Sequence, residues 1–114
     1  MTADDYRNLA LSLPHAVESA HHGHPDFRVK NKIFATLAYP DESRAMVKLT
    51  PAQQRTYRKR APKVFSPAAG AWGVKGATMV QLDLADPETI REALALAWRN
   101  VAPKGLHELL DNED

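Results

Sequence analysis

Apolar residues at three- and four-residue intervals predict a helix near each end of the chain. The first covers residues 4–12, and Thr2, with Asp5 three positions later, forms a box-like cap at its start. The second starts after Asp86 and ends before Pro103, followed by a short terminal turn and an acidic tail. Its predicted buried face consists of Ile90, Ala93, Leu94, Ala97, Trp98 and Val101.

Extended apolar patterns in the first half of the chain predict three strands, over residues 27–30, 32–39 and 44–49. Asn31 and the segment 40–43 supply turn residues between them, so the three strands form an antiparallel meander. Residues 78–84 alternate apolar and polar side chains and predict a further strand.

The middle of the chain predicts a basic helix. Thr50 as the cap, Pro51 at the first helical position and Gln53 at the box position mark its start, and it ends near Ala61. Its apolar face is thin, so it packs poorly and projects charge. After it, residues 66–78 are rich in proline, glycine and alanine and predict a loop that feeds a short hairpin.

These elements predict one α+β domain over residues 1–114. A central antiparallel sheet of about five strands is accompanied by an N-terminal helix, a middle basic helix and a long C-terminal helix. The length and the hydrophobic fraction of 44% are typical of a globular domain with a sizeable core.

Charge is distributed unevenly along the chain. The formal net charge is −3 for residues 1–26, +9 for 27–82 and −5 for 83–114. Such asymmetry indicates a polyanionic partner; the alternative is that the segments fold against each other and their charges interleave on one surface. The chain has no cysteine, its start lacks a signal-peptide pattern, and no apolar run is long enough for a membrane span. We therefore expect a cytoplasmic protein without a membrane partner.

The cations of the middle segment are candidate phosphate contacts, because lysine and arginine neutralise nucleic-acid backbones. The candidate nucleic-acid-binding residues are Arg28, Lys30 and Lys32 on the first hairpin, Arg55, Arg58, Lys59 and Arg60 on the basic helix, and Lys75 on the glycine-rich hairpin. Trp72 or Tyr39 could stack on an opened base. A tryptophan between glycines, however, is more typical of a core anchor, and this is the interpretation that we favour for Trp72.

The histidine cluster offers a second kind of chemistry. His21, His22 and His24 lie close to Asp26, and imidazoles with a carboxylate can bind a transition metal. A further ligand group is missing downstream, so we favour histidines that order the turn before the hairpin. No arrangement of nucleophile, base and acid is evident, and we expect neither catalysis nor a cofactor.

Four motifs together resemble the MmcQ/YjbR family of small bacterial proteins. They are Gly23-His24-Pro25-Asp26-Phe27-Arg28-Val29, Lys32-Ile33-Phe34-Ala35, Gly70-Ala71-Trp72-Gly73 and Ala97-Trp98-Arg99-Asn100-Val101-Ala102-Pro103-Lys104. The resemblance implies a compact α+β domain of CyaY-like fold, also likened to secretion chaperones, and DNA binding through a double wing of hairpins. It places the wings near residues 28–34 and 72–79. Ala77 departs from the family pattern, in which a bulky aromatic is frequent.

We therefore expect a protein that binds DNA with weak or modest affinity through its basic middle segment. The main alternative is a protein–protein interaction module that docks an unidentified protein on a sheet face or through its acidic termini. A third hypothesis is a small-molecule or metal site near His22, His24 and Asp26.

Overall fold

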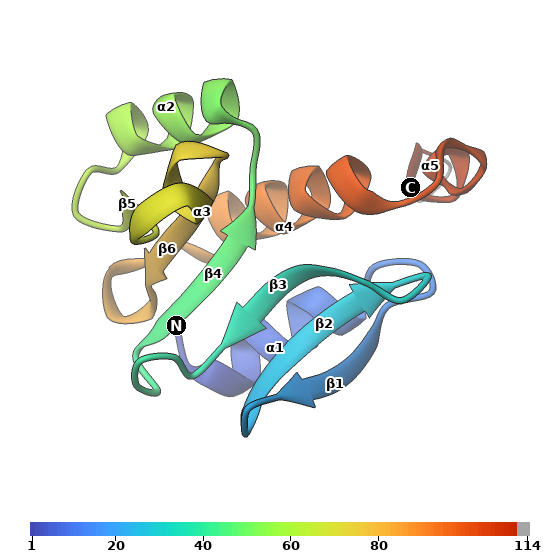
Figure 1. The fold of residues 1–114 in the computed structure, drawn as a ribbon, viewed down its shortest axis with the longest axis horizontal. Coiled ribbons are helices and arrows are strands. Elements are labelled where there is room, and N and C mark those ends of the chain that lie inside the picture. Colours follow the sequence, from blue (N-terminus) through green and yellow to red (C-terminus); the bar gives the residue numbers. More distant parts are fainter. Residues whose placement is uncertain (112–114) are drawn as a thin grey trace.

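The computed structural model describes residues 1–111, and Figure 1 shows its arrangement. In chain order the elements are α1 (Ala3–Leu11), β1 (Val17–His21), β2 (His24–Val29), β3 (Lys32–Leu37), β4 (Arg44–Lys48), α2 (Pro51–Arg60), β5 (Phe65–Pro67), α3 (Gly70–Val74), β6 (Ala77–Gln81), the 3-10 turn η1 (Leu82–Leu84), α4 (Pro87–Val101) and α5 (Lys104–Asp111). The predicted α+β class is confirmed. The predicted acidic tail falls mostly on residues 112–114, outside the described part.

Reciprocal capping boxes set the starts of α1 and α2. The Thr2 hydroxyl accepts a hydrogen bond from the Asp5 amide at 3.1 Å, and the Asp5 carboxylate accepts one from the Thr2 amide at 3.0 Å. Thr50 and Gln53 repeat this reciprocal box at the start of α2. Both boxes satisfy amides that the first turn leaves unpaired, and both confirm the predicted helix starts.

Within residues 1–111 the sheet has six antiparallel strands in the order β1-β2-β3-β4-β6-β5, one more than the predicted number of about five. The β1–β2 turn has positive φ at His22 (50°) and Gly23 (79°), and the β2–β3 turn has it at Lys30 (48°) and Asn31 (67°). Two consecutive left-handed residues are typical of the tight turns that match the twist of a hairpin.

Helices α1 and α4 cover one face of this sheet and lie behind it in Figure 1. Phe27, Leu37 and Val47 from the sheet are fully buried in this core. The buried Tyr6 hydroxyl of α1 donates to the Met46 carbonyl of β4 at 3.0 Å, which ties the helix to the sheet. Trp98 of α4 is also fully buried, as predicted.

Three predictions for the second half of the chain were wrong. Residues 66–78 form β5, the five-residue helix α3 and the start of β6, in place of a loop and a short hairpin. A wing-like hairpin over residues 72–79 is therefore absent, and α3 lies in front of the sheet in Figure 1. The last strand is shorter than predicted, because its end turns into η1, and the terminal turn is a full helix, α5.

Candidate nucleic-acid interface

Helix α2 has two different faces: a polar and an aromatic side chain point inward, and cationic side chains point outward. Gln54 is buried, and its amide nitrogen donates to the carbonyls of Gly73 at 3.1 Å and Ala77 at 3.0 Å. Tyr57 is buried against Phe65 of β5, with ring centroids 5.2 Å apart. These contacts fix the rotation of α2 and leave its opposite face to solvent.

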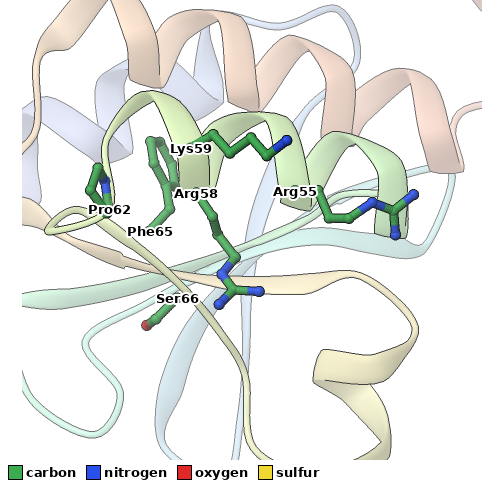
Figure 2. Close-up of a pocket in the computed structure, with 6 residues that line it drawn as sticks. All are labelled: Arg55, Arg58, Lys59, Pro62, Phe65 and Ser66. Atoms are coloured by element: carbon green, nitrogen blue, oxygen red, sulfur yellow. The ribbon is translucent and has the colours of Figure 1, made fainter.

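The outward face borders a groove of about 450 Å³, which we name the α2 groove. Its lining consists of Arg55, Arg58, Lys59, Pro62, Phe65 and Ser66. In Figure 2, Arg58 extends from α2 toward the strand that carries Ser66. Within residues 1–111, none of the three groove cations forms an ion pair with a carboxylate. Their charges are therefore available to an anionic ligand.

Two other predicted contact residues are already engaged. Arg28 donates from Nε and from one terminal nitrogen to the two oxygens of Asp26, at 2.8 and 3.0 Å. Arg60 lies 3.3 Å from Glu92 and 4.9 Å from the ring centre of Tyr57. The positive charge of each is therefore already paired with a carboxylate.

The remaining predicted contacts lie apart from the α2 groove. Lys30 and Lys32 are exposed at the β2–β3 turn, at the opposite side of the molecule from α2 in Figure 1. Lys75 follows α3 and lines a separate hollow with Lys48 and Trp72. The structure thus brings Arg55, Arg58 and Lys59 together and leaves the hairpin lysines elsewhere.

The sheet face opposite α1 and α4 carries a third hollow, which sequence reasoning missed. We name it the open-face pocket; its volume is about 530 Å³. It is lined by His21, His22, His24, Thr36, Tyr39, Met46, Ala68, Ala69, Trp72 and Met79. Trp72 is 58% exposed and Tyr39 is 56% exposed, so the core-anchor interpretation of Trp72 was wrong.

A buried ionic cluster lies beside this pocket. The Asp26 side chain is 0% exposed and also contacts Nδ1 of His21 at 2.8 Å. The Arg28 hydrogen bonds, and after them that of His21, hold the pKa of Asp26 below its usual range although burial opposes this. Within residues 1–111 no group of three His, Asp or Glu side chains is arranged to hold a metal ion. The Asp26 carboxylate instead pairs with Arg28 and orients His21.

This cluster predicts an acid-sensitive contribution to stability. Because the pKa of Asp26 is lower when folded than when unfolded, its stabilisation is present above about pH 4 and is lost as the pH falls below that value. We expect Asp26→Asn to reduce the free energy of unfolding by about 1–3 kcal/mol at pH 7 and by less at pH 3. Urea denaturation at both pH values measures the difference.

The control for this experiment is Asp83→Asn, which removes an exposed carboxylate of η1. It should change the stability by less than about 0.5 kcal/mol at either pH. An Asp26→Asn loss that is the same at pH 3 and pH 7 would show that the ionised carboxylate is not what stabilises the fold.

The fold and site define an α+β protein in which α1 and α4 cover one sheet face and the cationic helix α2 borders the sheet edge formed by β5. The YjbR family model matches residues 11–100, and the chain belongs to this family. The crystal structure of Deinococcus radiodurans protein DR2400, with the domain DUF419, is similar, with a TM-score of 0.76 and 25% identity over 91% of this chain and 80% of that chain. No curated protein sequence matches the chain. Within residues 1–111, no helix has the length and apolar character that a membrane span requires.

Proposed function

We propose that this protein binds nucleic acid through the α2 groove, with Arg55, Arg58 and Lys59 contacting backbone phosphates. The observation that carries the proposal is that these three cations share one helix face without an ion-pair partner in residues 1–111. Phosphates bound by such side chains release condensed counterions, which supplies affinity independent of base sequence. The proposal involves no catalytic step.

We expect weak or modest affinity for nucleic acid, because the proposal includes three phosphate contacts. Binding of this size is steeply dependent on salt, because each neutralised phosphate contributes roughly one unit to the slope of log affinity against log salt. Ser66, which also lines the groove, adds a hydroxyl that can donate to a phosphate oxygen. Arg28, Lys30, Lys32, Arg60 and Lys75 are left out of this primary contact set, since each is paired or lies on another surface.

The test is fluorescence anisotropy with labelled random-sequence DNA, single-stranded and duplex, across a salt series. Replacing Arg55, Arg58 and Lys59 together with glutamine should weaken binding about tenfold or more at low salt. It should also lower the salt slope by roughly two to three, because three phosphate contacts are lost.

A matched variant separates this groove from general charge. Lys30→Gln, Lys32→Gln and Lys104→Gln remove the same number of charges from exposed positions away from α2. This second triple variant should retain most of the affinity and nearly all of the salt slope. Equal losses in the two variants, or no binding to either form of DNA by the unmodified protein at low salt, would contradict the proposal.

A protein partner is the second candidate function. Trp72 and Val74 of α3 are both exposed, at 58% and 79%, and exposed apolar side chains are frequent at interfaces. Such binding would survive the α2 triple variant and would depend little on salt.

A further inference from the structure

We propose that the open-face pocket takes an unpaired base of a single-stranded nucleic acid whose backbone lies in the α2 groove. This inference rests on the proposed function and adds the form of nucleic acid that the protein prefers. It assigns a role to Trp72, Tyr39 and His21, which contribute nothing to the α2 groove.

The register of the sheet makes the two sites neighbours. Ser66, in the α2 groove, is the direct cross-strand partner of Met79, which lines the open-face pocket. Met79 in turn pairs directly with Met46, and Met46 with Thr36. Direct partners point to the same face of the sheet, and adjacent strands lie about 5 Å apart. A strand bound by its phosphates at Arg58 therefore has the pocket within one or two strand spacings.

The pocket offers the flat apolar surfaces on which bases stack. Trp72 lines two hollows: Lys48 Nζ, in one of them, lies 5.8 Å from its ring centre, and the open-face pocket also has Trp72 as a wall. Tyr39 is held by an edge contact with His24, with ring centroids 4.7 Å apart. Met46 and Met79, which are cross-strand partners, add apolar lining. Stacking of this kind tolerates any base, since each has a π face.

Polar groups at the wall match the edge of a base. The Asp26 carboxylate is a pure acceptor, so His21 donates to it from Nδ1 and keeps Nε2 free as an acceptor when its ring is neutral. Nε2 can accept an N–H of a base, and the Thr36 hydroxyl can donate or accept. Within the described residues, the pocket lining includes no carboxylate that would repel the phosphates of a bound strand.

The geometry favours a single strand over a duplex. A paired base is stacked between its neighbours and cannot reach a hollow on a sheet face, whereas an unpaired base can turn out of its strand. A volume of about 530 Å³ is also in the range of small-ligand sites rather than of extended interfaces. The positive charges of α2, and those of Lys48 and Lys75 in the hollow that Trp72 also lines, complement the negative charge of a nucleic-acid backbone.

The experiment compares three labelled ligands of equal length by anisotropy: oligothymidine, an abasic DNA strand with the same phosphates, and a duplex. Quenching of the protein's tryptophan emission is recorded alongside. Oligothymidine should bind about tenfold more tightly than the abasic strand and should quench Trp72. Trp72→Ala should reduce the oligothymidine affinity to that of the abasic strand, remove the quenching and leave the abasic affinity unchanged.

Val74→Ala is the matched variant, because Val74 is exposed on the same short helix and lies outside the pocket lining. It should bind oligothymidine as the unmodified protein does. Oligouridine is measured as a fourth ligand, to show whether the protein prefers RNA or DNA. Tighter binding of either oligothymidine or oligouridine than of the abasic strand supports the pocket.

Three results would overturn the inference. Equal affinity for oligothymidine and the abasic strand would show that the protein contacts only phosphates and that the pocket binds no base. Tighter binding of the duplex would contradict the preference for an unpaired base. An unchanged oligothymidine affinity in Trp72→Ala would contradict the base site and would assign Trp72 to a protein contact. Failure of all three ligands to bind at low salt would instead refute the proposed function itself, so the two failures are distinguishable.

Discussion

Trp98→Ala is expected to lower the free energy of unfolding by about 3–5 kcal/mol. The Trp98 side chain is 0% exposed in the core, and its indole N–H donates to the Pro14 carbonyl at 2.9 Å. Truncation leaves a cavity between α4 and the segment after α1, and it leaves that carbonyl without its partner. Since a domain of this size is stable by about 5–15 kcal/mol, much of the total would be lost.

The control is the same chemical change at the other tryptophan. Trp72 is exposed, so Trp72→Ala should alter the stability by less than about 0.5 kcal/mol. Trp98→Phe retains most of the ring but loses the donor, and we expect it to lie between the two. Urea denaturation of the three variants at pH 7 measures these differences. Similar losses for the two alanine variants would show that burial of Trp98 is not what stabilises the core.

The features that the sequence predicted correctly are those whose physical cause is local. The caps at Thr2 and Thr50 each join residues three positions apart, so all the interacting groups lie within one short segment. The buried face of α4, including Trp98, follows from helical spacing alone. Helical spacing also accounts for the common face of Arg55, Arg58 and Lys59, which all line the α2 groove; their contact with nucleic acid stays a prediction.

Strand β1 was missed because it is an edge strand with little contact to the core. Its residues Val17–Ala20 are all exposed, so the alternation that reveals a half-buried strand does not occur. His22 was interpreted as one of the histidines that order a turn before the hairpin, and in the structure it forms the tight β1–β2 turn together with Gly23. A glycine in a two-residue link between extended segments was the available signal for this hairpin.

The open-face pocket was missed because it depends on long-range register. Ser66 and Met79 meet only when β5 pairs with β6, and Met79 meets Met46 only when β6 pairs with β4. Trp72 was assigned to the core because an apolar residue between glycines has no local mark of exposure. In the structure Gly73 is the inward residue of α3, since a Cβ there would lie 1.8 Å from the Ala68 carbonyl oxygen.

Gly76→Ala is expected to destabilise the protein by about 2–4 kcal/mol, because it combines strain with a steric clash. Gly76 has φ of +113°, which side chains rarely adopt, and an added Cβ would lie 2.0 Å from the Leu49 carbonyl oxygen. Gly70→Ala adds strain alone, since Gly70 has φ of +67° and open space around it, while Gly105→Ala in α5 adds neither. We therefore expect the loss to be largest at Gly76, smaller at Gly70, and absent or reversed by up to about 1 kcal/mol at Gly105. Thermal unfolding of the three variants tests this order, and equal losses at Gly70 and Gly76 would show that the close approach to Leu49 is relieved at no cost.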